Sequence, residues 1–295
     1  MAETDVQIGN KVVGYDQPVF ITAEIGINHN GNLGMTQKLI DAAVVAGCDA
    51  VKFQKRTVEV VYTSEELAKP RENPFGPTNG DLKRGLEFGK KEYQQIDLYC
   101  KKRGILWFAS PWDEESVDFL ERFDVPCHKV ASASLTDDGL LQYIRSKGKP
   151  IILSTGMSDM EMINHAVKVA GLDDLILLHC TSVYPKVNLV TNTLSFVNLR
   201  VIDELKRCFS VPVGFSSHFS GIMPVLYAVA RGACMVEFHI TLDRALWGSD
   251  QASSLEPQEF TSLCRLIREF KIAEGDGIKI IYPEEVEAMK KLRRK

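Results

Sequence analysis

The feature that most constrains this chain is a regular alternation of short apolar runs with segments of helical pattern. Eight runs rich in Val, Ile, Leu and Phe occur, at residues 19–26, 50–54, 105–111, 127–132, 150–156, 175–182, 212–218 and 235–240. Each is followed by a segment whose apolar residues recur with helical spacing. The first of these segments is predicted to end at Gly47, and the segment 194–209 to form one helix. Strands that are apolar throughout are typical of a parallel sheet covered on both faces. Eight strand–helix units over residues 19–275 therefore predict a single α/β domain, a (β/α)8 (TIM) barrel.

The two ends of the chain and its long connections complete the predicted architecture. Residues 1–18 are expected to form a short hairpin that turns at Gly9 and caps the barrel, and residues 276–295 a truncated linker or tail. An open doubly wound sheet is the alternative, but its G-x-G-x-x-G first turn does not match GINHNGNLG at 26–34. The connections at 55–89 and 183–193 follow the carboxyl ends of strands, so they are predicted to be binding loops or lids.

Composition excludes several classes of protein. The 295 residues carry a formal net charge of −4, and the sequence pI of about 5.9 argues against a nucleic-acid partner. No apolar run reaches the roughly 18 residues of a membrane span, and the start of the chain lacks the pattern of a secretory leader. The seven cysteines are dispersed without C-x-x-C spacing and predict reduced thiols. We therefore expect a cytoplasmic protein with no membrane partner.

Polar side chains stand at the carboxyl end of every predicted strand, where packing alone would favour Val, Ile or Ala. A buried polar group without a partner costs about 1–3 kcal/mol, so these residues are expected to have functions. Active sites of barrel enzymes lie at this end of the strands. Helix capping is an alternative role for Ser132 and Ser217. The strand-end set is Glu24, Lys52, Gln54, Ser110, Lys129, Ser132, Ser154, Thr181, Ser216, His218, Glu237 and His239.

His218 and His239 end consecutive strands, which closure of the barrel places about 4.8 Å apart. Two imidazoles at this short distance, with Glu24 on the first strand, which closure places beside the last, predict a divalent metal site. The alternative is that both are hydrogen-bonded histidines at the rim. The remaining four histidines are weaker candidates: His128 is expected to face the helices, His165 the solvent and His179 the core, and His29 is within reach of the site.

Lys52 and Lys129 have the same parity along their strands, so both should point into the barrel. A buried ammonium group needs an anion. The simplest occupant is a phosphate or carboxylate of a substrate, assisted by the serine hydroxyls. The alternative is that both lysines pair with carboxylates of the protein. A metal beside an anion pocket indicates a reaction that joins a phosphorylated acid to a carbonyl compound.

Nine motifs resemble, in order and over nearly the whole chain, the sialic acid synthase family, whose members condense phosphoenolpyruvate with an N-acyl mannosamine or a related amino sugar. They are AEIGINHNG (23–31), VKFQK (51–55), LEF (86–88), HKVAS (128–132), LSTGM (153–157), HCTSVYP (179–185), GFSSH (214–218), EFHITLD (237–243) and GSDQASSLEP (248–257).

The resemblance implies a set of roles for the residues that match these motifs. It places manganese or magnesium on His218 and His239. It assigns phosphoenolpyruvate to Lys52, Ser110, Lys129, Ser132, Ser154 and Ser216, and the amino sugar to Glu24, Gln54, Tyr184 and Asp250. Thr181 is a further substrate-binding candidate, from its place at a strand end, and Glu24, Lys52 and Lys129 are the expected catalytic residues. The enol carbon would attack the sugar aldehyde, water would add, and phosphate would leave by C–O cleavage.

One feature departs from the family pattern. Family members usually continue into a small antifreeze-like domain that lays an arginine over the partner's site, whereas this sequence stops at IIYPEEVEAMKKLRRK (280–295). The expected partners are therefore a second copy in a homodimer or a separate lid-domain protein. Two other functions stay open: a phosphoenolpyruvate–aldose condensing enzyme, and a non-catalytic barrel that assists a complete synthase.

Overall fold

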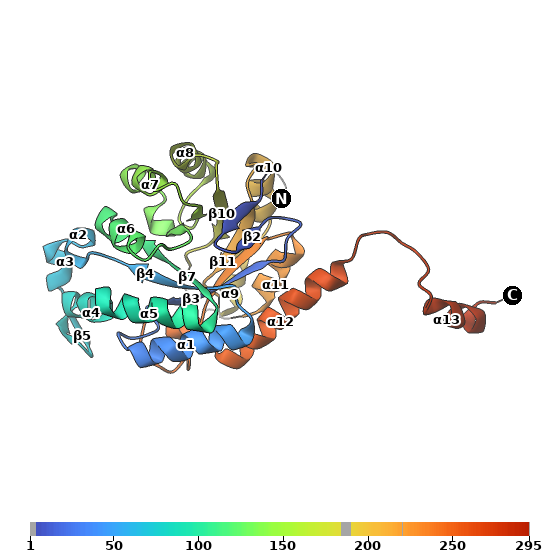
Figure 1. Ribbon diagram of the computed structural model, residues 1–295, viewed down its shortest axis with the longest axis horizontal. Coiled ribbons are helices and arrows are strands. Elements are labelled where there is room, and N and C mark those ends of the chain that lie inside the picture. Colours follow the sequence, from blue (N-terminus) through green and yellow to red (C-terminus); the bar gives the residue numbers. More distant parts are fainter. Residues whose placement is uncertain (1–3, 184–189, 220, 295) are drawn as a thin grey trace.

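The computed structural model describes residues 4–183, 190–219 and 221–294, and it confirms the predicted barrel (Figure 1). Eight parallel strands form one sheet in the order β7-β4-β3-β12-β11-β10-β9-β8, and β7 and β8 pack side by side to bring its two edges together. The strands are β3 (Phe20–Gly26), β4 (Ala50–Lys55), β7 (Leu106–Pro111), β8 (His128–Val130), β9 (Ile151–Ser154), β10 (Leu175–Cys180), β11 (Val213–Ser217) and β12 (Met235–His239). All eight lie within predicted runs or within one residue of them.

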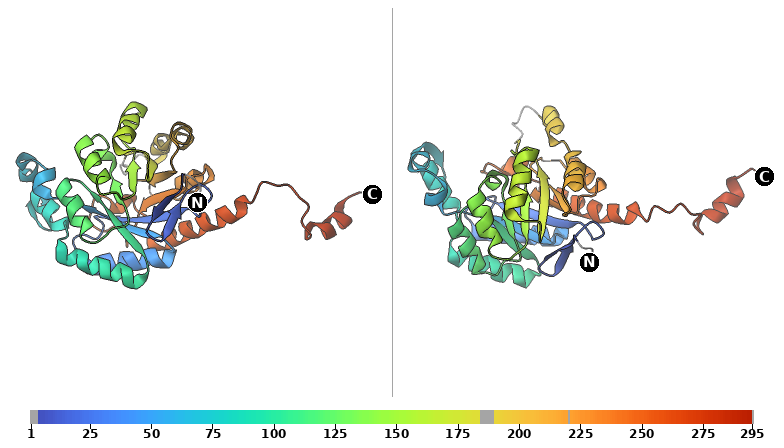
Figure 2. Two further views of the ribbon diagram at one scale, coloured as in Figure 1. Left: turned by 45° about the horizontal axis from the view of Figure 1, so that its top comes forward. Right: turned by 90° about the horizontal axis from the view of Figure 1, so that it is seen from above.

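Burial of the strands explains why the apolar runs predicted a parallel sheet. Every residue of β3 is buried, as is every residue of β8 to β12, because helices cover the outer face while side chains fill the inner one. The outer layer surrounds this sheet in Figure 1 and in the two views of Figure 2. It consists of α1 (Leu33–Ala46), α5 (Lys90–Arg103), α6 (Glu114–Glu121), α7 (Asp138–Arg145), α8 (Met160–Ala170), α10 (Val201–Cys208), α11 (Met223–Ala230) and α12 (Pro257–Glu274).

Local sequence sets where these helices begin and end. The Asn32 side chain accepts a hydrogen bond from the backbone of Met35 and so caps α1, which ends at Gly47 with φ 83°, as predicted. The expectation of one helix over 194–209 is wrong. Asn198 adopts φ 43° and divides this segment into α9 (Val190–Val197) and α10, because a left-handed residue cannot continue an α-helix.

The connection after β4 is a folded excursion rather than a structureless loop. We call residues 56–89 the β4–α5 excursion. It contains α2 (Val58–Val61), α3 (Ser64–Ala68), the hairpin of β5 (Pro70–Asn73) and β6 (Gly76–Thr78), and α4 (Asn79–Leu86). A capping box of Thr78 and Asp81 starts α4. The end of the excursion packs on the loop after β3, where the ring of Phe88 stacks on His29 at 4.2 Å.

The hairpin predicted at the amino end is present. Strands β1 (Val6–Ile8) and β2 (Lys11–Val13) pair around Gly9, which has φ 58°. Val6, Ile8 and Val13 are buried in the main core. Gly9 lies against Leu106 and Pro126, near the amino ends of β7 and β8, which is where a cap over the bottom of the barrel would lie.

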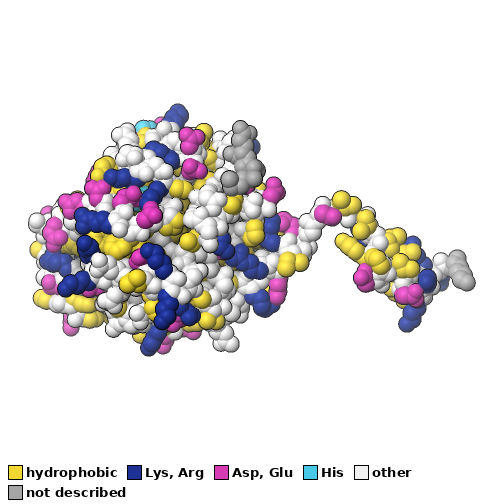
Figure 3. Space-filling model, in the orientation of Figure 1, with side chains coloured by type: hydrophobic (Ala, Val, Ile, Leu, Met, Phe, Trp, Pro, Cys, Tyr) yellow, Lys and Arg dark blue, Asp and Glu magenta, His cyan; other side chains and the backbone are white. Residues whose placement is uncertain are grey.

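The carboxyl-terminal residues leave the barrel. After α12 the chain runs away from the domain to α13 (Glu285–Leu292), as all three views in Figures 1 and 2 show. Apolar side chains are visible on this segment in Figure 3, and Ile280, Ile281 and Tyr282 are at least half exposed. These residues therefore add nothing to the core of the barrel.

Two observations on the described residues concern the cysteines and the helices. All seven cysteines are free thiols, and five of them are buried. None of the helices in the described ranges is both long and apolar enough to cross a bilayer.

Candidate active site

A cavity of about 100 Å³ lies at the carboxyl ends of the barrel strands, and we call it the central cavity. Each of the eight strands, or the residue directly after it, contributes at least one side chain. Eleven of the twelve strand-end residues predicted from the sequence meet there: Glu24, Lys52, Gln54, Ser110, Lys129, Ser132, Ser154, Ser216, His218, Glu237 and His239. The lysines lie on β4 and β8, on either side of β7, whereas the histidines lie at the ends of β11 and β12. The cavity therefore has a cationic arc and an imidazole arc.

Lys52 is held by carboxylates of the protein. Its Nζ lies 2.8 Å from Oε2 of Glu24 and 3.7 Å from Oε1 of Glu237, and it donates to Oγ of Ser110 at 3.2 Å. Burial lowers the pKa of Lys52, but Glu237 and Glu24 outweigh burial and raise it above its ordinary value. Lys52 therefore stays charged, and the pairing with protein carboxylates that the sequence left open is present for this lysine.

Lys129 is less well compensated. Its Nζ donates to Oγ of Ser154 at 2.6 Å and to the Val130 carbonyl at 3.2 Å, while Oε1 of Glu237 lies 3.9 Å away. Burial is the main cause of a pKa below the ordinary value, and Glu237 offsets only part of it. An anion placed beside Lys129 would stabilise its charged form, so this lysine is the better candidate for holding a substrate anion.

The two carboxylates of the cavity differ in protonation. Burial raises the pKa of Glu24 to about 7, and the attraction of Lys52 offsets only part of this. Burial acts in the same direction on Glu237, but Lys129 and Lys52 prevail and leave its pKa below the ordinary value. At neutral pH Glu237 is ionised, whereas Glu24 can both give and accept a proton.

The imidazoles of His218 and His239 have ring centroids 5.4 Å apart and planes inclined by 40°. Burial lowers the pKa of His239 to about 4, so its ring is neutral at pH 7 and has a lone pair to offer. Its buried Nδ1 has no hydrogen-bond partner in the described part of the chain, and neither has Oε2 of Glu237. Buried polar atoms normally have a partner, so these two atoms fit a site that a ligand or water completes.

The histidine pair fits a divalent metal only in part. Among the residues that the structure describes, no group of three or more His, Cys, Asp or Glu side chains is arranged to hold a metal ion. Two imidazoles with water and substrate oxygens as further ligands suit Mn²⁺ or Mg²⁺. Cys180 adds a sulfur 3.6 Å from Nδ1 of His218. Asp250 is close enough to contribute to the raised pKa of His218 and to offset part of the lowering of the His239 pKa by burial.

Three predicted site residues do not line the central cavity. The Thr181 hydroxyl donates to the Phe196 carbonyl at 3.0 Å and faces a neighbouring small cavity. Asp250 begins a 3₁₀ turn at Gln251–Ser253, and its carboxylate accepts from Ser249. Tyr184 lies outside the described residues.

The other histidines lie where the sequence placed them, with one exception. His128 points outward to Glu121 of α6 at 2.8 Å, His165 is an exposed partner of Asp138, and His179 is buried and bonded to the Val197 carbonyl. His29, which was expected within reach of the site, is instead buried beside Phe88 and is not among the residues that line the central cavity.

Burial of His29 leads to a prediction about acid stability. Burial lowers its pKa to about 3, whereas an unfolded histidine has a pKa of about 6.5. Between these values the unfolded chain binds the proton and the folded chain does not, so stability falls as the pH falls below 6.5. His29→Gln should reduce this slope by up to about 1.4 kcal/mol per pH unit in urea unfolding between pH 4 and 6. An unchanged slope would contradict the assignment; the exposed His165→Gln variant is the control.

Glu237 belongs to the strand-end set, but no specific role was predicted for it from the sequence. It stands two positions before His239, and side chains two apart on a strand share a face. That spacing is the signal that places Glu237 inside the barrel with the histidine. Trp112 and Cys180, which also line the cavity, gave no comparable signal, because Cys180 lies in an apolar run and Trp112 follows the end of one.

Comparison with known proteins identifies the family of this chain. Residues 39–279 match the NeuB family. N-acetylneuraminate-9-phosphate synthase of Homo sapiens is 37% identical over 285 residues, which cover 95% of this chain and 78% of that protein. N,N'-diacetyllegionaminic acid synthase of Campylobacter jejuni is 38% identical over 267 residues, covering 88% and 78%. The crystal structure of N-acetylneuraminic acid (sialic acid) synthetase from Leptospira borgpetersenii matches with a TM-score of 0.83 at 33% identity, over 99% of this chain and 98% of that one.

These matches cover most of the chain, and the family match begins at residue 39, within α1. They confirm the family that the nine motifs predicted, and the similar proteins are named as synthases of sialic or legionaminic acids. The chain belongs to the NeuB family.

Proposed function

We propose that this chain condenses phosphoenolpyruvate with an N-acyl mannosamine-type amino sugar, or its 6-phosphate, to give a nonulosonic acid and phosphate. The observation that carries the proposal is one cavity with two buried lysines on one arc and two close histidines on the other. A phosphorylated acid suits the first arc and a metal-bound carbonyl the second. The reaction is a transferase reaction, and we place it in the cytoplasm, where free cysteines such as these seven stay reduced.

The cationic arc binds phosphoenolpyruvate. Lys129, with Ser154 and Ser132 beside it, holds one anionic group, and Lys52 with Ser110 holds the other. Ser132 is already fixed, because its Oγ accepts a hydrogen bond from the backbone of Gly156 at 3.0 Å. Since burial raises the pKa of Glu24 to about 7, Glu24 is protonated in a fraction of the protein molecules at neutral pH. In those molecules the two lysines face only the Glu237 carboxylate, so the cavity carries a net positive charge before substrate binds. That charge favours entry of the anion.

The imidazole arc receives the sugar aldehyde. His218 and His239 would hold a divalent cation, manganese or magnesium, that polarises the aldehyde oxygen. Lys52 and Lys129 keep the enol carbon of phosphoenolpyruvate directed at the aldehyde carbon and offset the negative charge of the phosphate until it leaves with its bridging oxygen. Glu24, beside Gln54, orients the sugar hydroxyls and exchanges a proton with the sugar oxygen or the water that adds.

A phosphate-release assay tests this function. The full chain is given phosphoenolpyruvate with a panel of amino sugars, with and without a chelator, and then Mn²⁺ or Mg²⁺ is restored. We expect release only when an amino sugar and metal are both present. Preference for an ordinary aldose phosphate would identify the related phosphoenolpyruvate–aldose reaction instead. No release with any acceptor would overturn the proposal for the chain alone.

The same assay tests the proposed partners. We propose that the chain acts as a homodimer or with a separate lid-domain protein. It spans 78% of the Homo sapiens and Campylobacter jejuni synthases and 98% of the Leptospira borgpetersenii chain. Activity that appears only on addition of an antifreeze-like domain polypeptide would identify a lid-dependent barrel. Activity of the isolated chain, with its mass in solution measured at the assay concentration, would decide between the monomer and the dimer.

A further inference from the structure

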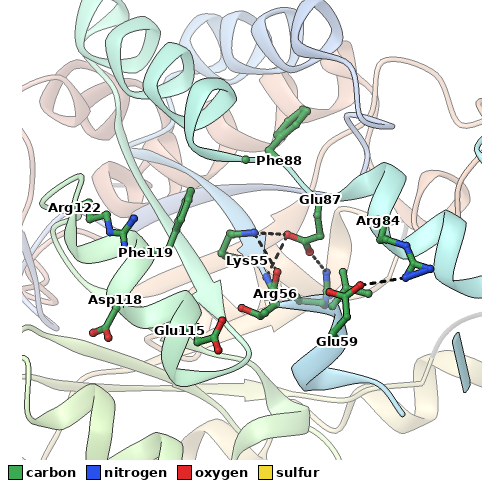
Figure 4. Close-up of a pocket in the computed structure, with 13 residues that line it drawn as sticks. Lys55, Arg56, Glu59, Arg84, Glu87, Phe88, Glu115, Asp118, Phe119 and Arg122 are labelled. Carbon is green, nitrogen blue, oxygen red and sulfur yellow. Dashed lines mark hydrogen bonds and ion pairs between the residues drawn. The ribbon is translucent and has the colours of Figure 1, made fainter. Parts of the chain in front are cut away.

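A charged cluster joins the β4–α5 excursion to the edge of the central cavity. Lys55 and Arg56 follow Gln54 on the chain, and Glu87 comes from the far end of the excursion; Figure 4 shows both cations directed at the Glu87 carboxylate. The three side chains are only 11–12% exposed and line an outer cavity of about 650 Å³. This outer cavity is separate from the site described above, but Gln54 connects the two.

The chemistry of Arg56 sets the orientation of the Gln54 amide. A guanidinium group can donate hydrogen bonds but cannot accept them. Arg56 donates through Nη2 to Oε1 of Gln54, so the amide oxygen must face Arg56. The amide nitrogen then faces the other way, where it donates to Oε1 of Glu24 at 3.1 Å. Without Arg56 the Gln54 amide oxygen would lose this partner, and of the two hydrogen bonds only the one to Glu24 would still hold the amide.

Arg56 is itself fixed from two sides. Its Nη1 donates to Oε1 of Glu87 at 3.4 Å, and its backbone N–H donates to Oε2 of the same carboxylate at 3.3 Å. The guanidinium also stacks over the Trp112 ring at 4.3 Å, and Trp112 lines the central cavity. Lys55 holds Glu87 from the other side, with Nζ 3.0 Å from Oε2. The orientation of Gln54 therefore depends on the folded excursion that supplies Glu87.

We propose that Arg56 is a positioning residue for the acceptor sugar. It selects the one Gln54 amide orientation that donates to Glu24, and Glu87 couples this choice to docking of the β4–α5 excursion. The expected effect on sugar binding rests on the proposed function, whereas the orientation of the Gln54 amide does not depend on it. Arg56 is not among the residues that line the central cavity, so it acts through Gln54 and not by contact with substrate.

Steady-state kinetics of the full chain with metal test the consequence. Arg56→Ala should raise KM for the amino sugar about tenfold or more while KM for phosphoenolpyruvate changes less than twofold. Arg56→Lys keeps one donor and should restore part of the loss. Arg84→Ala is the matched control, because Arg84 lines the same outer cavity but pairs there with the exposed Glu59. A sugar KM unchanged in Arg56→Ala, or both KM values raised alike, would overturn the proposal.

Side-chain amide NMR separates this inference from the proposed function. ¹⁵N-glutamine labelling gives the side-chain amide signals, and Gln54→Ala assigns the one from Gln54. The Gln54 side-chain amide protons should exchange slowly with water in the unaltered chain and in Arg84→Ala, and quickly in Arg56→Ala and Glu87→Gln. The signal needs no turnover. If no amino sugar supports phosphate release but the amide behaves in this way, the proposed function fails and the positioning role of Arg56 stands. An amide that Arg56→Ala leaves unchanged overturns that role whatever the activity.

Discussion

Replacing Glu237 with glutamine is expected to lower the free energy of unfolding by about 3–5 kcal/mol, the usual cost of removing one partner from a buried ion pair. Glu237 is buried between two lysines, 3.7 Å from Lys52 and 3.9 Å from Lys129. Lys52 keeps Glu24, but Glu237 is the one carboxylate within 4 Å of Lys129 in the described residues. The variant therefore leaves a buried ammonium group without a counter-charge.

The same substitution is expected to abolish most of the phosphate release. The pKa of Lys129 already lies below its ordinary value because of burial, and Glu237 is the main group that raises it. Without Glu237 the lysine loses its proton more readily and holds an anion less well. Denaturant unfolding and phosphate release measure the two effects. The control is Glu269→Gln, which removes one partner of the exposed pair with Arg265 and should change the free energy of unfolding by no more than about 0.5 kcal/mol. A Glu237→Gln variant as stable as this control would contradict the expectation.

Replacing either His218 or His239 with alanine is expected to lower turnover by at least about 10²–10³-fold, because polarisation of a carbonyl by a metal is worth several kcal/mol. Each variant removes one of the two imidazoles that lie 5.4 Å apart. Binding of Mn²⁺ to the free protein, measured by calorimetry, should weaken in both variants. Loss of metal binding distinguishes a ligand from a histidine that only supports packing.

The matched control for both variants is His165→Ala, whose side chain is 60% exposed and pairs with Asp138 on the outer layer. It should keep turnover and metal affinity. Added metal at high concentration should restore part of the activity of His218→Ala or His239→Ala if one imidazole remains as a ligand. Metal-dependent turnover that survives in both variants would exclude the histidine pair as the metal site.

The barrel and most of its site were predictable because they follow from short-range patterns. Strands buried on both faces need apolar side chains throughout, so the eight runs identified the sheet with errors of at most two residues at their ends. Alternation along each strand then placed Lys52, Lys129 and His239 inside. The prediction of one helix over 194–209 was wrong because the apolar pattern remains helical through Asn198. An asparagine can adopt the left-handed conformation but does not have to, so the sequence did not reveal that Asn198 ends a helix there.

What the sequence by itself determined, then, is the fold, the family and the identity of most of the polar groups that meet in the central cavity. Only the tertiary structure decided how those groups share their charges. Lys52 pairs with Glu24 while Lys129 does not, and the folded excursion brings Glu87 beside Arg56. The physical reason is range: burial patterns repeat along the chain, whereas ion pairs depend on distances of a few ångströms between residues tens of positions apart.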